Sequence, residues 1–328
     1  MRFRLGLIFA ALSGIWLAIF FFYPLKLPEA PFAYELKSGY TLKAVARSLV
    51  RHKVLWEPWT FIFVRRLTGS QSKIKAGSYE WDTPMTGWQL LSGMTRGDVV
   101  QNEIRLGEGM TFAQFRNLLD QNPDLKHVTL GQSDAWVLER LSISQSSPEG
   151  LFFPDTYYFN HEDSDLRIMK RAELSMERHL GPLWSQRFAH LPYESAYQLL
   201  IMASLVEKET ASSEERPLVA GVFINRLRRG MRLQTDPTVI YGLGAQYDGH
   251  LHKRDLLADT PWNTYTRGGL PPTPIAMPGE AALDAAAHPA STEALYFVSK
   301  GDGTHQFSST LEEHQRAIDR YVFGRTTR

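Results

Sequence analysis

The 328-residue chain lacks cysteine altogether. Disulfide bonds and thiolate-bound metals are therefore excluded, and the absence fits an oxidising compartment such as the periplasm, where a free thiol is a hazard. An excess of one charge is also missing, since 36 basic side chains are balanced by 35 acidic ones. Proteins that bind nucleic acid usually carry an excess of basic charge on one face, so we expect no nucleic-acid partner.

Motifs of several common enzyme classes are missing too. There is no Gly-x-Ser-x-Gly turn, no Walker loop and no His-x-x-x-His pair among the ten histidines. His250 and His252 alone give little support for zinc, and we expect neither a metal nor another cofactor. Ser204 and Lys208 are one helical turn apart, but a serine in the middle of a helix is poorly placed for a Ser–Lys hydrolase.

The N-terminus carries a long hydrophobic run. Residues 5–23 (LGLIFAALSGIWLAIFFFY) are uncharged, and at about 1.5 Å per residue they approach the roughly 30 Å hydrocarbon core of a bilayer. A cleaved signal peptide is the alternative, but its apolar part is shorter and ends at small residues, whereas bulky residues follow here. Arg2 and Arg4 precede the run, so residues 1–23 are predicted to be a cytoplasmic tip and a transmembrane anchor, with the rest of the chain outside.

The rest of the chain is expected to form a tether and two folded parts. Residues 24–33 are rich in proline and predict an extended tether. Residues 34–100 predict a small module with helices near 42–50, 59–67 and 86–94 and a strand near 76–81. Residues 101–328 predict a larger domain.

The larger domain is expected to mix helices with a few strands, which makes the fold class α+β. A strongly apolar helix is predicted at 195–210, and the capping-box spacing of residues 212–215 predicts another that stops at Gly230. After Leu233 the chain is expected to be rich in loops. Closing elements are expected in this order: a helix at 281–287, a β-hairpin at 295–307 and a helix at 311–323.

Glu207 is the strongest candidate for a chemical role. On a helix it shares one face, to within about 40°, with Ala196, Leu200 and Ala203. Burial along this apolar face raises the pKa of a carboxyl group, and a general acid for glycosidic cleavage needs to hold its proton near neutral pH. Spacing alone leaves a structural alternative open, in which Glu207 caps the helix or pairs with an arginine. Lys208 and Glu209 are expected to point elsewhere, as a solvated or structural pair.

Two polar segments are further candidates. Residues 232–241 (RLQTDPTVIY) place short polar side chains beside a proline, which suits hydrogen bonding to sugar hydroxyls and acetamides, although a turn built by Asp236 and Pro237 is an equal alternative. Residues 262–279 combine aromatics that can stack on sugar rings with a stiff proline-rich stretch, and a covering loop on the core is the alternative.

Together these segments resemble the YceG-like family, the endolytic murein transglycosylases. No single segment is specific, but the set follows the family's order over nearly the whole chain. The matching stretches are 149–157 (EGLFFPDTY), 203–210 (ASLVEKET), 222–227 (VFINRL), 233–242 (LQTDPTVIYG), 263–265 (NTY), 269–272 (GLPP), 287–289 (AHP) and 295–298 (LYFV). Thr273 and Met277 depart from the pattern, where smaller or amide residues are expected.

The resemblance implies a fold and a set of site residues. Residues 34–100 would be a LysM-like α/β module, and residues 101–328 a mostly helical, lysozyme-related catalytic domain with a β-hairpin and long loops. The glutamate of the Val-Glu-Lys-Glu-Thr motif is the family's catalytic residue, which here is Glu207. The expected substrate-binding residues from the matching stretches are Glu149, Asp155, Gln234, Thr235, Asp236, Thr238, Tyr241, Asn263 and Tyr265.

The resemblance also implies an activity. The chain would cut the MurNAc–GlcNAc bond of nascent peptidoglycan strands, leave 1,6-anhydro-MurNAc ends and so terminate elongation. Its expected partners are glycan strands, the inner membrane and, transiently, the peptidoglycan synthases. Two alternatives remain: a muramidase that uses Asp236 as a second carboxylate, and a non-catalytic glycan-binding scaffold.

Overall fold

The computed structural model describes residues 2–28, 32–37, 39–68, 74–98, 102–160 and 163–324, and the side chains of residues 2–10 lie outside this description. The chain divides into two compact units. Unit 1 comprises residues 1–103, 124–126 and 158–163, and unit 2 comprises residues 104–123, 127–157 and 164–328. The fold is a mixed α+β arrangement, mostly helical with small sheets.

Unit 1 follows the order helix, strand, helix, helix, strand, helix. Its elements are α1 (Arg2–Phe22), β1 (Phe32–Leu36), α2 (Leu42–Arg51), α3 (Trp59–Leu67), β2 (Gly77–Trp81) and α4 (Gly87–Arg96). Strands β1 and β2 are antiparallel, with Tyr34 opposite Tyr79, and both tyrosines are buried under the helices. The predicted helix near residues 86–94 is α4; the Thr86–Gln89 capping box begins it, and Gly97, at φ 81°, ends it.

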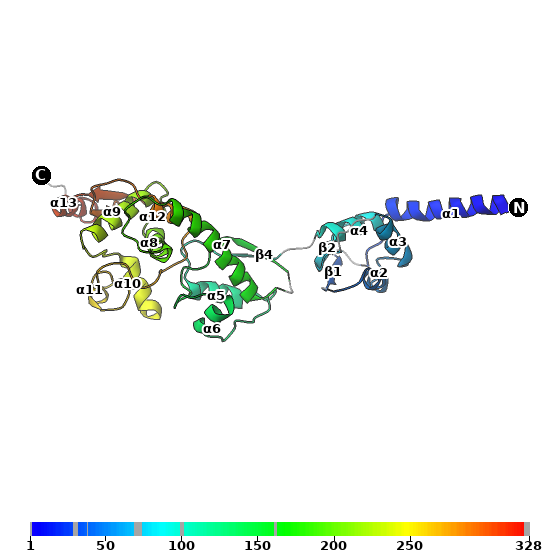
Figure 1. Ribbon diagram of the computed structural model, residues 1–328, viewed down its shortest axis with the longest axis horizontal. Helices are drawn as coiled ribbons and strands as arrows, with labels where there is room; N and C mark the ends of the chain where they lie inside the picture. Colours follow the sequence, from blue (N-terminus) through cyan, green and yellow to red (C-terminus); the bar gives the residue numbers. More distant parts are fainter. Residues whose placement is uncertain are drawn as a thin grey trace. The chain divides into compact units, whose positions relative to one another are not determined.

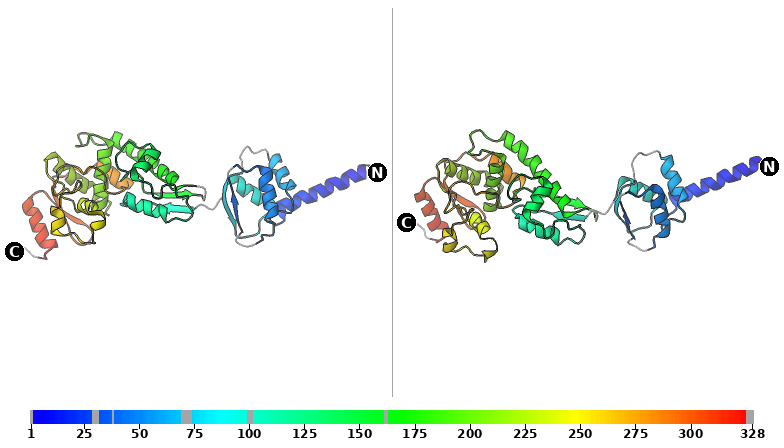
Figure 2. Two further views of the ribbon diagram at one scale, coloured as in Figure 1. Left: turned by 90° about the horizontal axis from the view of Figure 1, so that it is seen from below. Right: turned by 60° about the horizontal axis from the view of Figure 1, so that its bottom comes forward.

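Helix α1 packs against unit 1 through its last turns. Phe20 is buried in the same core as the sheet, and its ring lies so close to Gly87 that a Cβ on Gly87 would overlap it. Figures 1 and 2 show the rest of α1 projecting from the other elements of this unit. The predicted anchor lies partly outside the described residues; in the part that is described, no helix is both long and apolar enough to cross a bilayer.

Unit 2 holds most of the helices and a hairpin. Its helices are α5 (Phe112–Asp120), α6 (Asp134–Leu141), α7 (Asp165–Gln186), α8 (Ala196–Glu209), α9 (Arg216–Arg228), α10 (Asp236–Leu243), the short 3₁₀ turn η1 (Gly244–Gln246), α11 (Lys253–Leu257), α12 (Glu280–Ala287) and α13 (Leu311–Tyr321). Strands β5 (Tyr296–Ser299) and β6 (His305–Ser308) form the predicted antiparallel hairpin. Strands β3 (Asn102–Arg105) and β4 (Thr156–Phe159) form another two-stranded sheet.

The core of unit 2 is built around α8. Helices α7, α9, α10 and α12 all contact it, and α12 contacts it most extensively (Figure 1). The inner face of α12 is almost entirely alanine, with residues 285–287 buried, so the two helix backbones approach closely. This packing fixes the position of α8 and of the polar residues at its C-terminal end.

Two predictions about this unit are wrong in detail. The expected capping box at residues 212–215 does not form: α9 begins at Arg216, and the carboxylate of Glu215 instead accepts hydrogen bonds from the backbone and ring of His305. The segment after Leu233 is not simply a loop, because residues 236–243 form α10 with a proline in its first turn. The contact that decides the first case joins residues 90 positions apart, so local spacing does not contain it.

Candidate active site

Helix α8 carries Glu207 out of the hydrophobic core. Ser195 caps the helix by accepting a hydrogen bond from the backbone N–H of Gln198 at 3.3 Å. Residues 199–206 are all buried, and Glu207 is the first position where the helix leaves the core. Leu200 and Ala203, which share its face, are buried as the sequence predicts.

The Glu207 carboxyl group is enclosed but has polar partners. Only 6% of its side chain is exposed. Its Oε2 accepts a hydrogen bond from the backbone N–H of Gly279 at 3.0 Å, and its Oε1 lies 3.3 Å from Nη2 of Arg216. Burial raises the pKa of Glu207, and the charge of Glu108 adds to this; the Gly279 hydrogen bond, Arg216 and Lys208 lower it, and the net direction is upward.

A short loop before α5 closes this end of α8. The N–H of Gly109 donates to the carbonyl of Met277, and the N–H of Met277 donates to the carbonyl of Met110, both at 2.8 Å. This pairing brings the carboxylate of Glu108 against Gly279, where a Cβ would overlap it. Gly279 therefore stands between two carboxyl groups: its N–H donates to Glu207, and its missing side chain leaves room for Glu108.

Asp236, which the sequence suggests as a second carboxylate, has a different neighbourhood. Its Oδ1 accepts a 2.6 Å hydrogen bond from the hydroxyl of Tyr265, and its charge acts on Glu209. The acidic residue whose charge raises the pKa of Glu207 is Glu108. Sequence reasoning missed Glu108, and the one available signal was a carboxylate in a Gly-Glu-Gly turn just before a helix cap.

Lys208 and Glu209 each have their own partner and do not form the expected pair. Nζ of Lys208 donates to the carbonyl of Gly109 at 3.2 Å. The carboxyl group of Glu209 bonds to the hydroxyl of Thr235, and burial raises the pKa of Glu209 to about 7. Glu209 thus ties the end of α8 to the start of α10.

Thr235 and Thr238 belong to a buried polar cluster. The N–H of Thr235 donates to Oγ1 of Thr264 at 3.0 Å, and the hydroxyl of Thr238 donates to the carbonyl of Thr235 at 2.7 Å. All three threonines are buried, so their hydrogen bonds are used to fix α10 against the 263–265 segment. In the same segment, Gln234 is exposed and adopts a positive φ of 48°.

Glu149, which is buried, and Tyr241, which is partly exposed, are hydrogen-bonded to each other. Oε1 of Glu149 accepts from the N–H of Phe112 at 2.9 Å, and Oε2 accepts from the hydroxyl of Tyr241 at 3.0 Å. Burial raises the pKa of Glu149 to about 7 and raises that of Tyr241 as well. Both residues line a surface groove whose other walls include Arg116 and Asp134; Glu207 does not line it.

Asn263 and Asp155 make hydrogen bonds to the backbone that hold neighbouring segments in place. Asn263 is fully buried, and its Nδ2 donates to three backbone carbonyls, the shortest being that of Ala258 at 2.6 Å. Its Oδ1 accepts from the N–H of Tyr265 at 2.8 Å. Asp155 is exposed, and its Oδ1 accepts from the N–H of Thr156 at 2.7 Å at the start of β4.

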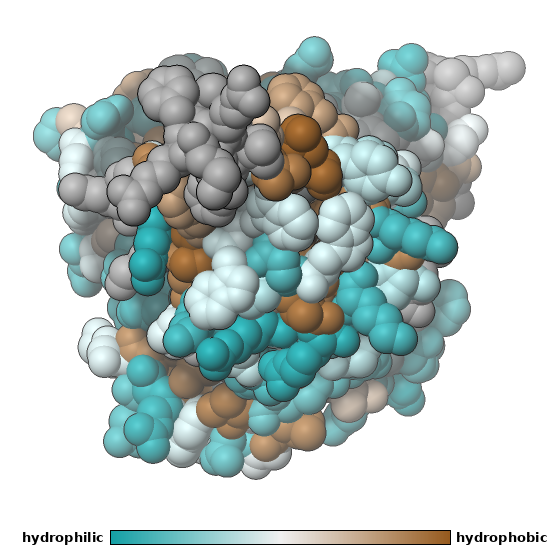
Figure 3. Space-filling view, turned by 90° about the vertical axis from the view of Figure 1, so that its right-hand side faces the viewer, coloured by the Kyte–Doolittle hydropathy of each residue, from teal (hydrophilic) through white to brown (hydrophobic). Residues whose placement is uncertain are grey.

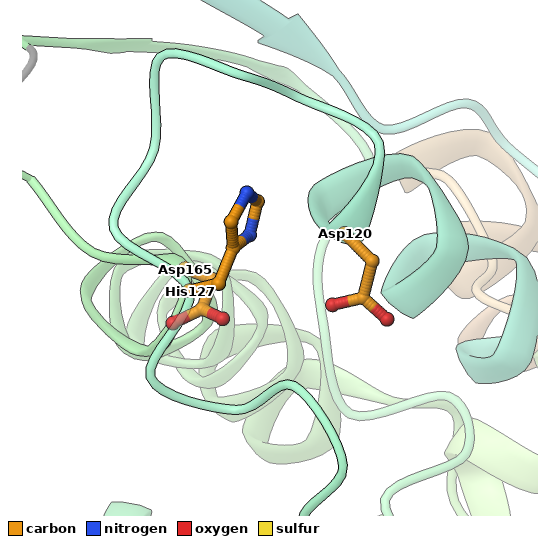
Figure 4. A group of neighbouring side chains, drawn as sticks. All are labelled: Asp120, His127 and Asp165. Atoms are coloured by element: carbon orange, nitrogen blue, oxygen red, sulfur yellow. The ribbon is translucent and has the colours of Figure 1, made fainter.

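Asp120, His127 and Asp165 form the cluster with metal-ligand spacing that the described residues contain (Figure 4). Asp165 already accepts four hydrogen bonds: Oδ1 from the N–H groups of Val128 and Leu166, and Oδ2 from the N–H and hydroxyl of Thr129. A carboxylate with both oxygens filled in this way fastens a loop to the first turn of α7.

The geometry around Glu207 defines a class of site. An enclosed carboxyl group whose pKa is raised by burial suits a general acid for glycosidic cleavage. Its pairing with Arg216 is also the contact that the structural alternative expected. Comparison with known proteins agrees with this class. The chain belongs to the YceG-like family, whose model matches residues 34–320.

Named relatives cover most of the chain. A protein of Bacillus subtilis (strain 168) named endolytic murein transglycosylase is 31% identical over 88% of this chain and 84% of its own length. A protein of the same name from Streptococcus pneumoniae serotype 2 (strain D39) is 27% identical over 90% of this chain and 58% of its own length. The crystal structure of a putative YceG-like protein from Listeria monocytogenes has a TM-score of 0.58 at 29% identity, and covers 87% of this chain and 98% of that one.

Proposed function

We propose that this chain is a peptidoglycan lytic transglycosylase that cleaves the MurNAc–GlcNAc bond and leaves 1,6-anhydro-MurNAc ends. Family membership and the names of the relatives support this reaction. The single observation that supports a catalytic role for particular atoms is the enclosed Glu207 carboxyl group, with its raised pKa and its contacts to Gly279 and Arg216.

In the proposed reaction Glu207 acts twice. First, protonated Glu207 gives its proton to the glycosidic oxygen as the bond from that oxygen to C1 of MurNAc breaks, with the sugar's own acetamide assisting at C1. The Glu207 carboxylate that results is stabilised by the Gly279 N–H and by Arg216. It then accepts the proton of the C6 hydroxyl as O6 bonds to C1 and the bond from the acetamide oxygen to C1 breaks, which closes the anhydro ring and restores the acid.

The neighbouring carboxylate of Glu108 favours a second candidate reaction, hydrolysis. A two-carboxylate muramidase needs a partner roughly 5–9.5 Å from the acid. Glu108 is the acidic residue that contacts Gly279 and acts on Glu207, so it replaces Asp236 as the candidate for that partner. A hydrolase would leave reducing-end MurNAc, whereas the transglycosylase leaves anhydro-MurNAc.

Product analysis tests the proposal. Purified glycan strands are digested with the full chain and with Glu207→Gln, and the ends are identified by mass spectrometry. We expect anhydro-MurNAc ends from the wild type and a loss of at least about 100-fold with the variant, because removal of the acid removes both proton transfers. Mostly reducing ends would replace the proposal with hydrolysis. Strands left uncut by both the wild type and the folded variant would leave only a glycan-binding scaffold, and equal cleavage by both would overturn the role of Glu207.

The segments around α10 supply the proposed glycan contacts. Asp236 and Gln234 are exposed, and Tyr265 and Tyr241 are partly exposed, which supports a direct contact of these four residues with a sugar. Other expected binding residues, which are buried and bonded inside the protein, would act by holding that surface in shape; they are Glu149, Thr235, Thr238 and Asn263.

We further propose that residues 1–23 anchor the enzyme in the inner membrane, with the N-terminus in the cytoplasm and the folded units in the periplasm. The uncharged run at residues 5–23 and the arginines before it support this arrangement. The β-α-α-β order of β1, α2, α3 and β2 supports a LysM-like module, and the buried helix that presents Glu207 supports a lysozyme-related domain. A tethered enzyme meets nascent strands and the synthases that make them.

A further inference from the structure

An unpaired apolar surface lies along α3 in unit 1. Its members, at helical spacing, are Trp59, Phe63 and Leu67, which are 64%, 49% and 67% exposed. The opposite face of α3 is apolar too, and Phe61 and Val64 are buried there in the core. Arg66, seven residues after Trp59, adds one exposed charge to this face at the C-terminal end of α3. The rest of the face is more apolar than the outer face of a solvated helix, which indicates that something apolar covers it.

This surface is continuous with α1. Nε1 of Trp16 on α1 donates a 2.6 Å hydrogen bond to Oγ1 of Thr60 on α3. Leu12, Trp16 and Leu17 of α1 line one hollow together with Trp59 and Phe63 of α3. If α1 is the anchor, the part of α1 that lies beside α3 is inside the bilayer. Helix α3 is therefore at the same depth.

Aromatic and charged residues at the edges of this surface match a membrane interface. Tyr23 and Trp56, both exposed, lie with their ring centroids 6.0 Å apart where α1 ends. The acidic residue at this end of α3, Glu57, accepts hydrogen bonds from the N–H groups of Trp59 and Thr60, so its charge is offset by the helix N-terminus. Figure 3 looks at the molecule from the side to which α1 points in Figure 1, and shows brown, hydrophobic residues there among near-white and teal ones.

We propose that the face of α3 formed by Trp59, Phe63 and Leu67 is seated in the outer leaflet of the membrane, beside α1. Unit 1 is then held against the lipid surface at two places, α1 and α3, and does not swing freely on a flexible tether. The inference rests on the proposed anchor, because continuity with α1 identifies lipid, and not a protein, as the occupant. Tryptophan and phenylalanine at this depth are favourable in the interfacial region of a bilayer.

Site-directed spin labelling tests the proposal, and the absence of cysteine makes single labels simple to place. Full-length chains with Trp59→Cys, Phe63→Cys, Leu12→Cys or Glu80→Cys are labelled with a nitroxide and reconstituted in vesicles of phosphatidylethanolamine and phosphatidylglycerol. Collision with oxygen, which concentrates in lipid, is compared with collision with a water-soluble nickel complex. Glu80 is the control, because it is exposed and alternates with buried Tyr79 on β2, so it points away from the helices.

The proposal expects an oxygen-to-nickel collision ratio several-fold higher at positions 59 and 63 than at position 80, with position 12 at least as deep. If the label at position 12 is buried in lipid but the labels at positions 59 and 63 are exposed to water, the anchor is supported and the seating of α3 is overturned. A water-exposed Leu12 would overturn the anchor and this inference together, while the mass-spectrometric assay of Glu207 still tests the reaction by itself. Concentration-dependent broadening at position 63 would assign the surface to a second copy of the chain and also overturn the proposal.

Discussion

The pKa of Glu207 results from opposing influences of burial and of four neighbouring residues. Burial and Glu108 favour the protonated form, which the first proton transfer needs. Gly279, Arg216 and Lys208 favour the carboxylate, which the second transfer needs. A single group that must act as acid and then as base in one turnover works best when neither form is strongly preferred. This balance of neighbours supports the proposed reaction, in which one carboxyl group serves both steps.

Glu108 and Lys208 should shift the pH dependence in opposite directions. Glu108→Gln removes a negative charge that raises the pKa of Glu207, so Glu207 loses its proton at lower pH and the alkaline limb of kcat/KM moves down. Lys208→Met removes a positive charge that lowers the same pKa, so that limb moves up. The measurement is kcat/KM against pH for both variants on isolated glycan strands. Shifts in the same direction would contradict the assignment of the alkaline limb to Glu207.

At the residue level, helix spacing indicated Glu207 as a candidate and the family motif predicted its catalytic role, but neither indicated its neighbours. The apolar face of α8 is visible in the sequence, because positions 200, 203 and 207 are spaced by helix geometry alone. Gly279 is 72 residues away from Glu207 along the chain, and Glu108 reaches it only because the 107–110 loop pairs with Met277. Contacts at such separations depend on the fold, and no local pattern encodes them.

At the level of elements, Asp165 links the start of α7 to the loop that follows α5. Its carboxylate accepts from Val128 and from both the N–H and the hydroxyl of Thr129, and Asp165 is fully buried. In Asp165→Asn an NH₂ group takes the place of one acceptor and faces donors. We expect the free energy of unfolding to fall by about 2 kcal/mol, measured by urea denaturation.

Asp120 is the matched control for this variant. It belongs to the same cluster, but its Oδ1 has no hydrogen-bond partner among the described residues, so Asp120→Asn should change the stability by less than about 0.5 kcal/mol. A melting temperature that rises with added divalent cation in the wild type, but not in Asp120→Asn, would show that the cluster binds a metal and would replace the structural interpretation.

Element prediction succeeded where local signals agreed with the packing. Helix α3 at residues 59–67, the Gly97 end of α4 and the hairpin of β5 and β6 all follow from periodicity and turn residues. It failed at α10, where Pro237 indicated a turn although proline is also favourable in a first helical turn. At the start of α9, Glu215 satisfied a capping pattern but is held by His305, 90 residues further on.

At the scale of the whole molecule, the proposed anchor determines where the enzyme meets its substrate. An enzyme held at the inner membrane reaches strands as they leave the synthases, while a free periplasmic form must find them by diffusion. We therefore expect that a chain lacking residues 1–30, directed to the periplasm by a cleavable signal peptide, digests isolated strands normally but does not replace the native protein in cells. Strand-length distributions of the isolated cell wall are the readout.

A chimera with a foreign transmembrane helix separates the effect of tethering from the effect of seating α3 in the membrane. Residues 1–23 are exchanged for an unrelated transmembrane helix of equal length, which restores attachment but removes the Trp16–Thr60 hydrogen bond and the Phe20 contact with Gly87. If attachment alone limits function, this chimera restores normal strand lengths. If α1 must also hold unit 1 against the membrane, restoration is partial, and returning Trp16 and Phe20 to the foreign helix improves it. Full replacement by the free periplasmic form would contradict both, since neither attachment nor orientation would then matter.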